Sequence, residues 1–270
     1  MPSYSHYIAR TDRPCAVVAH RGIWDDAPEN SLLAIWKAIR TGCEVVEIDV
    51  RRSADGEFFL LHDETLDRMV GLNKAPETMA AQELRALKLR NRDGGPSNLL
   101  TSEKLPSLKE IFELTRNRIF VHLDIKQREI LPEVMACARS MGAHQQVDYW
   151  GDLRTQADLG WVRRAVEPQG VLFMAKTHLD AADADAQLEL LLELSPPMCE
   201  IYFDRLEQVA ALKDRFEEAG ITVWYNTLDP VSCAGFTDTA ALENPEAICG
   251  SPIDAGISVI QTDYAQHLKA

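Results

Sequence analysis

The stretch VVEIDVRRSADGEFFLLHDE, residues 45–64, contains two apolar runs separated by a tight-turn signal. Asp55-Gly56 predicts a two-residue hairpin loop between two antiparallel strands. That loop would pair residue 54 with 57, and therefore residue 49 with 62.

The first run carries two acids, Glu47 and Asp49, in an otherwise apolar strand. Because side chains alternate between the two faces of a strand, both carboxylates point the same way. On the hairpin register His62 stands opposite Asp49, and parallel strands would still bring the three together at their carboxyl ends. Two carboxylates this close repel each other unless a cation lies between them, and oxygen ligands alone suit Mg²⁺ or Ca²⁺. The stretch therefore predicts a site for one divalent cation.

Outward from this stretch, short β-rich runs alternate with helical patterns along the whole chain. Such alternation indicates an α/β fold with a parallel sheet and helical crossovers. The candidate strands are residues 15–20, 43–50, 57–62, 118–126, 146–150, 170–176, 198–203, 221–226 and 256–263. A TIM barrel has eight strands, one fewer than these nine candidates. The count agrees if one strand of the hairpin is an antiparallel extension outside the barrel. We expect a (β/α)8 TIM barrel, rather than a doubly wound sheet, as one domain over residues 1–270.

Residues 65–110 depart from the alternation of strands and helices. This segment is too long and too polar for an ordinary loop between a strand and a helix. We predict a small insertion after the third strand region, with one helix over residues 78–88 and a Gly/Pro-rich loop. Just before the hairpin, residues 31–42 form a helical pattern that Asn30 can cap and Gly42 can end.

The composition is that of an ordinary globular protein, with 46% hydrophobic and 26% charged residues. A net charge of −14 disfavours nucleic acid as a partner. Six dispersed cysteines without a C-x-x-C pair argue against a structural zinc site. Neither a signal peptide nor a membrane span is expected, which predicts a cytoplasmic protein; its oligomeric state is open.

Other strand ends carry complementary residues. VVAHRG ends in His20 and Arg21, and VHLDIK places His122, Asp124 and Lys126 on a single face. Asp124 is a candidate third metal ligand, and the basic residues Arg21 and Lys126 are candidates to hold an anion. His122 lies one layer deeper and is interpreted as a hydrogen-bonded core residue.

These residues suit phosphoryl transfer. A metal and bases neutralise the charge of the phosphate, and two histidines can move protons on and off the attacking and leaving oxygens. Histidine suits this task near neutral pH because its ordinary pKa is about 6.5.

The combination of motifs resembles the glycerophosphodiester phosphodiesterase family. The matching motifs are His20-Arg21-Gly22, Pro28-Glu29-Asn30, Glu47-Ile48-Asp49, Asp55-Gly56, the segment HDETLDR at 62–68, and Leu123-Asp124-Ile125-Lys126. The likeness covers about residues 15–268 and departs in having Asp124 where many members have Glu.

The resemblance implies a TIM barrel that hydrolyses a phosphodiester to an alcohol and sn-glycerol 3-phosphate or a related monoester. By position it implies His20 and His62 as the acid/base pair. It also implies metal ligands at Glu47, Asp49 and Asp124, and substrate contacts at Arg21, Lys126, Trp224 and Asn226.

Three alternatives keep some of these residues in other roles. A hydroxyl of the substrate could attack first and give a cyclic phosphate, as in phospholipase D-like barrels. Lys126 could form a Schiff base as in an aldolase, although this leaves the paired acids unexplained. The chain could also be a barrel that binds a sugar phosphate without catalysis. The identity of the alcohol and the choice between Mg²⁺ and Ca²⁺ stay open at this point.

Overall fold

The computed structural model describes residues 1–269, which divide into two compact units. Among the described residues, the first unit comprises 1–18 and 148–269, and the second comprises 19–147. Once β3, β4 and β5 are set aside, the order of strand followed by helix occurs eight times along the chain. This is the predicted (β/α)8 TIM barrel, with a small antiparallel hairpin inserted after β3.

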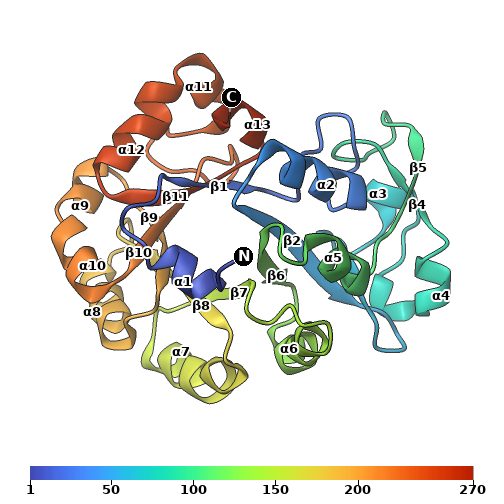
Figure 1. Cartoon of the computed structure of the whole chain (residues 1–270), viewed down its shortest axis with the longest axis horizontal. Helices are drawn as coiled ribbons and strands as arrows, with labels where there is room; N and C mark the ends of the chain where they lie inside the picture. The colour runs from blue at the N-terminus through green and yellow to red at the C-terminus, as the bar shows by residue number, and fades with distance from the viewer. Residues whose placement is uncertain (270) are drawn as a thin grey trace. The chain divides into compact units, whose positions relative to one another are not determined.

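The second unit contains the acidic strand and the insertion. Its elements in chain order are α2 (Leu32–Thr41), β2 (Val45–Arg52), β3 (Phe58–Leu60), α3 (Asp67–Val70), α4 (Ala81–Leu84), β4 (Lys88–Arg90), β5 (Leu100–Lys104), α5 (Leu108–Thr115), β6 (Phe120–Ile125) and α6 (Leu131–Ser140). β2 lies between β6, its parallel neighbour, and β3, its antiparallel neighbour, and α2 packs beside α5 (Figure 1). The surplus strand is thus the antiparallel extension that the turn signal predicts.

The first unit contains the remaining strands. Its elements are α1 (Tyr4–Ile8), β1 (Ala16–Ala19), β7 (Val147–Asp152), α7 (Gln156–Trp161), β8 (Leu172–His178), α8 (Ala184–Leu194), β9 (Met198–Tyr202), α9 (Leu206–Ala210), α10 (Lys213–Ala219), β10 (Thr222–Asn226), α11 (Asp238–Glu243), α12 (Ser251–Asp254), β11 (Ile257–Thr262) and α13 (Ala265–Leu268). Its strands β7 to β11 pair in chain order, and α8, α10 and α12 pack against β8, β10 and β11 (Figure 1).

The hairpin register differs from the prediction by one residue. Arg52 pairs with Phe58, so the loop spans five residues rather than two, and Asp49 lies opposite Leu61 instead of His62. Ser53 closes this wider loop, since its hydroxyl accepts from the Glu57 amide at 2.9 Å. The turn signal predicted the hairpin correctly, but the side chain of Ser53 sets its length.

The helix after the first strand begins one residue later than predicted. Ser31, not Asn30, is the N-cap, and its hydroxyl accepts from the amide of Ala34 at 3.1 Å. Gly42 ends the helix in a left-handed conformation, as expected. The side chain of Asn30 is therefore available for another contact, described below.

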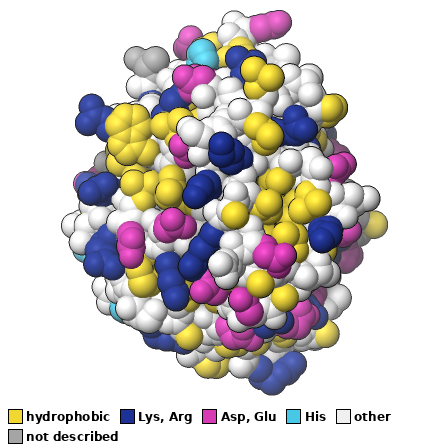
Figure 2. Space-filling model, turned by 90° about the vertical axis from the view of Figure 1, so that its right-hand side faces the viewer, with side chains coloured by type: hydrophobic (Ala, Val, Ile, Leu, Met, Phe, Trp, Pro, Cys, Tyr) yellow, Lys and Arg dark blue, Asp and Glu magenta, His cyan; other side chains and the backbone are white. Residues whose placement is uncertain are grey.

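The insertion is more structured than the sequence suggested. The predicted helix over 78–88 is reduced to α4, because the chain leaves it to pair β4 with β5. Leu84, Leu89 and Leu105 are buried in a small apolar cluster of this segment's own. Figure 2, which looks onto the side of α3, α4, β4 and β5, shows Lys and Arg side chains gathered among hydrophobic and acidic ones.

Within residues 1–269, no helix combines the length and apolarity that crossing a bilayer requires.

Candidate active site

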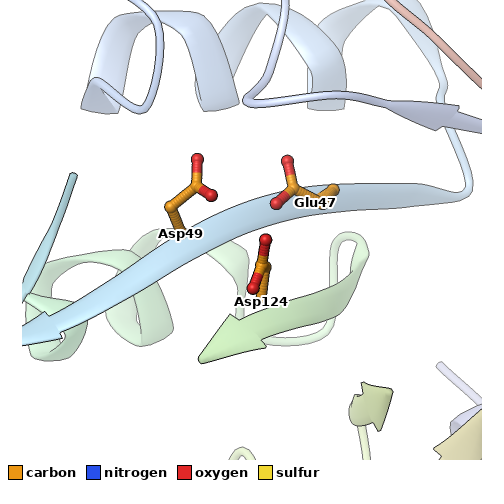
Figure 3. A group of neighbouring side chains, drawn as sticks. All are labelled: Glu47, Asp49 and Asp124. Carbon is orange, nitrogen blue, oxygen red and sulfur yellow. The ribbon is translucent and has the colours of Figure 1, made fainter. Parts of the chain in front are cut away.

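Three carboxylates gather on two neighbouring parallel strands of the second unit. Glu47 and Asp49 extend from β2, and Asp124 extends from β6, where it pairs directly with Asp49 (Figure 3). One oxygen from each lies within 4.8 Å of the others. Glu47 and Asp49 are 3% and 1% exposed, whereas the side chain of Asp124 is 22% exposed. The cluster is therefore buried on one side and open to solvent through Asp124.

The electrostatics of the cluster differ from one acid to the next. Burial, followed by the charge of Asp49, raises the pKa of Glu47 to about 7. Burial acts on Asp49 in the same direction, but Lys126 and Arg21 outweigh it and hold the pKa of that carboxyl below its usual range. An all-oxygen set with one acid that resists ionisation fits a hard divalent cation, whose charge would offset the repulsion.

Two cations flank Asp49. The Nζ atom of Lys126 lies 2.7 Å from one oxygen of Asp49 and 2.6 Å from an oxygen of Asp124. The Nε atom of Arg21 lies 3.1 Å from the other oxygen of Asp49. Both side chains are only partly exposed, 18% and 15% respectively. The two predicted anion-binding residues thus stand beside the carboxylates, where they can also reach an anion bound there.

A strained turn places His20 and Arg21 at the cluster. Arg21 and Gly22 both have positive φ angles, 55° and 87°, so the backbone reverses sharply after His20. The reversal directs the backbone amide of Arg21 to donate to Glu47 at 3.0 Å and brings Nε2 of His20 to 3.9 Å from the same carboxylate. A Cβ on Gly22 would lie 2.7 Å from a backbone carbon of Ala34, so only glycine fits here.

His62 stands at the exposed edge, held by a chain of charged groups. Its Nδ1 lies 2.8 Å from Asp63, and Arg68 donates twice to that carboxylate, at 2.7 and 2.9 Å. Arg68 also donates to Glu29 at 2.7 Å, and Glu29, which is 2% exposed, accepts from Arg21 at 3.1 Å. Burial would raise the pKa of Asp63, but its bonds to Arg68 and His62 lower it to about 2. Asp63 is therefore a charged acceptor that fixes the orientation of the imidazole.

Asn30 makes two hydrogen bonds to Asp49, one of the three acids of the cluster. Its amide donates to Asp49 at 2.7 Å, and its carbonyl oxygen accepts from the backbone amide of Asp49 at 3.2 Å. Asn30 is 3% exposed and has a φ of 57°, a conformation that asparagine tolerates better than most residues. This two-point contact orients the carboxylate of Asp49.

The structure thus brings together all the site residues predicted in the second unit, namely His20, Arg21, Glu47, Asp49, His62, Asp124 and Lys126. The sequence did not predict that Glu29, Asn30, Asp63 and Arg68 hold these site residues in place through hydrogen bonds. All four residues belong to the motifs PEN at 28–30 and HDETLDR at 62–68, in which the sequence predicted a role only for Asn30, as a helix cap, and for His62. His122 is 4% exposed, in keeping with a core residue.

The remaining two predicted residues belong to the first unit, on β10. The ring of Trp224 is fully buried, and its Nε1 donates to Asn226 at 2.8 Å. Asn226 in turn donates to Glu200 at 3.0 Å. Both residues are thus parts of a polar network at the end of β10.

Parts of the chain are similar in sequence to known proteins and protein families. Residues 20–149 match the model of the glycerophosphoryl diester phosphodiesterase family, and residues 173–270 match a domain family of unknown function. The glycerophosphodiester phosphodiesterase of Caldanaerobacter subterraneus is 32% identical over 116 residues, which cover 43% of this chain and 46% of that protein. Glycerophosphodiester phosphodiesterase 1 of Mus musculus is 33% identical over 118 residues, covering 41% of this chain and 34% of the relative. The chain thus spans less than half the length of these curated relatives.

Solved structures match over nearly the whole chain. A glycerophosphodiester phosphodiesterase from Thermotoga maritima has a TM-score of 0.71 at 24% identity and covers 95% of this chain and 97% of its own. A phosphodiesterase from Oleispira antarctica, solved in complex with the product sn-glycerol-3-phosphate, has a TM-score of 0.66 at 21% identity, with 95% and 96% covered. These similarities confirm the TIM-barrel fold.

Proposed function

We propose that the protein hydrolyses glycerophosphodiesters to an alcohol and glycerol 3-phosphate or a related phosphomonoester, because residues 20–149 match the model of the glycerophosphoryl diester phosphodiesterase family. The observation that carries the proposal is the cluster of Glu47, Asp49 and Asp124 with a histidine beside it. A cluster of this kind, flanked by bases, suits a phosphodiester better than any neutral substrate.

The acidic cluster is the proposed site of one divalent cation, Mg²⁺ or Ca²⁺. Glu47, Asp49 and Asp124 would hold it, and the ion would supply charge neutralisation for the phosphate. Asn30 would keep the carboxylate of Asp49 in its binding orientation, as outer hydrogen bonds commonly do for metal ligands. Arg21 and Lys126 would bind the non-bridging phosphate oxygens.

The two histidines are the proposed acid and base. Water attacks phosphorus, one imidazole accepts the proton of that water, and the other donates a proton to the departing alkoxide oxygen as its bond to phosphorus breaks. Nε2 of His20 lies 3.9 Å from Glu47, whereas Nδ1 of His62 lies 2.8 Å from Asp63, so the two imidazoles are held by different carboxylates. Asp63, held by Arg68, would keep His62 in one ring orientation through the reaction.

The test is turnover of a panel of glycerophosphodiesters by wild type and by two variants, His20→Asn and His62→Asn. We expect each variant to lose about 10²–10⁴-fold in kcat with an unchanged melting temperature. The matched control is His144→Asn, at an exposed position. EDTA should abolish turnover and either Mg²⁺ or Ca²⁺ should restore it; full activity in EDTA, or in either histidine variant, contradicts the proposal.

The same reaction distinguishes hydrolysis from internal transfer. Phosphorus NMR of the first product should show a phosphomonoester and no cyclic phosphate. Accumulation of a cyclic phosphate before any monoester would assign the first step to a hydroxyl of the substrate instead.

A further inference from the structure

The first unit has a polar face at the carboxyl ends of its strands that the proposed reaction does not use. The parallel registers align Asp152 with Lys176, Lys176 with Glu200, and Glu200 with Trp224. A second row, nearer the strand ends, aligns His178 with Tyr202. Ligands of α/β folds bind at this end of the strands.

This face is opposite to the one that α7 covers. Tyr149 and Phe173 lie on the helix-covered side, with the Tyr149 ring 6.2 Å from that of Trp161 in α7. Since side chains alternate, Trp150 and Lys176 point to the other side. We call this group the strand-end face and define it by the residues Trp150, Asp152, Arg154, Lys176, His178, Glu200 and Tyr202.

Lys176 is held in a fixed position over two aromatic rings. Its Nζ lies 4.4 Å from the ring centre of Trp150, 5.2 Å from that of Tyr202 and 3.4 Å from Glu200. Its side chain is 19% exposed, so a ligand can still reach the ammonium. Because the protein's own cation occupies the faces of both rings, a cationic ligand such as a quaternary ammonium has no aromatic face to bind here.

Glu200 is equally constrained, at one of its two oxygens. Oε1 accepts from the hydroxyl of Tyr202 at 2.7 Å and from Asn226 at 3.0 Å, and it is the oxygen nearest to Lys176. Asn226 is itself oriented by Trp224. With these contacts at Oε1, Oε2 can accept from a ligand hydroxyl, and the ammonium of Lys176 has donors for a ligand oxygen.

The charges of the face balance each other. Arg154 lies 3.8 Å from Asp152 and 2.7 Å from Nε2 of His178, whose Nδ1 lies 3.1 Å from Asp180. The ring of His178 stacks on that of Tyr202, with centroids 4.4 Å apart and planes 12° from parallel. Since each cation stands beside an acid, the face has little surplus charge to hold a free anion. A neutral ligand with several hydroxyl groups satisfies both the donors and the acceptors.

We propose that the strand-end face binds a neutral polyol, a sugar or cyclitol, through hydrogen bonds to Lys176, Glu200 and Arg154. The ammonium of Lys176 selects against quaternary ammonium groups by occupying their place. This inference does not depend on the phosphodiesterase reaction, because none of its residues takes part in the proposed chemistry.

The test is saturation-transfer NMR of the full-length protein with two probes, myo-inositol and choline. Wild type should transfer saturation to myo-inositol and not to choline. Lys176→Met should reverse this preference, because it removes the ammonium donor and leaves the carboxylate of Glu200 without a cation near the ring of Trp150. Lys213→Met, which makes the same change at a half-buried lysine of the same unit outside this face, should behave as wild type.

A second variant distinguishes a loss of binding from a folding defect in Lys176→Met. Tyr202→Phe keeps the ring but removes the hydroxyl that binds Glu200, and it should reduce transfer to myo-inositol at least threefold without admitting choline. Tyr264→Phe, at a 38% exposed tyrosine, is its control. Transfer to choline in wild type, an absence of transfer to myo-inositol, or an unchanged preference in Lys176→Met overturns the proposal.

Discussion

Replacing Glu47 by glutamine should make the metal-free protein more stable at alkaline pH. Burial and the neighbouring Asp49 raise the pKa of Glu47 to about 7 in the folded protein, against 4.5 for an ordinary glutamate. Each pH unit between these values corresponds to about 1.4 kcal/mol, so ionising the buried group costs the folded state about 3 kcal/mol. Glutamine keeps the shape and can still accept from the amide of Arg21, but it has no charge to bury.

The sign of the pH dependence follows from the raised pKa. Between pH 4.5 and 7 the folded protein retains a proton that the unfolded chain has released. The free energy of unfolding of wild type therefore falls as the pH rises through this window, and the full cost is present above it. Glu47→Gln lacks this contribution, so the variant should gain about 2–3 kcal/mol relative to wild type between pH 5 and pH 8.

The assay is urea denaturation in EDTA at pH 5 and pH 8, followed by the same experiment with Mg²⁺ or Ca²⁺. A bound cation at 100 times its dissociation constant stabilises a folded protein by about 2.7 kcal/mol, and we expect this gain in wild type but not in the variant. The advantage of the variant at pH 8 should thus largely disappear when the metal is added, because the two contributions are of similar size. Glu113→Gln, on the exposed side of α5, is the control. Equal pH dependence of wild type and Glu47→Gln in EDTA, or equal stabilisation of both by metal, would refute the reasoning.

Three further changes test the supports of the site. Asn30→Gly removes the amide that binds Asp49 without straining the positive φ, and isothermal titration should show metal affinity reduced about 10–100-fold; unchanged affinity would exclude this support. Asp63→Asn should lower kcat about tenfold with little change in KM, since His62 loses its charged acceptor. Because the pKa of Asp63 is lowered to about 2, wild type should also lose about 1 kcal/mol more stability than this variant as the pH falls from 4 to 2; equal acid sensitivity would argue against the pair. Gly22→Ala should destabilise the protein by about 2–4 kcal/mol in urea titrations, because its Cβ would lie 2.7 Å from a backbone carbon of α2, and a loss below 0.5 kcal/mol would contradict the close approach.

The sequence alone determined those features that depend on short periodicities. Alternation along residues 45–50 was enough to place Glu47 and Asp49 on one face, and alternation along residues 120–126 did the same for Asp124 and Lys126. The turn signal at Asp55-Gly56 predicted that one strand of the hairpin is an antiparallel extension, and the structure shows that this strand is β3. These features are local because a strand repeats every two residues whatever surrounds it.

Only the tertiary structure decided which side chains meet across the fold. Asn30 seemed a helix cap from its position, yet it binds Asp49, and Arg68 reaches Glu29, 39 residues away along the chain. The placement of Lys176 over Trp150 likewise depends on the register between β7 and β8, which no pattern within either strand encodes. Such contacts are fixed by distances through space, and those distances exist only once parallel strands have paired and helices have packed on them.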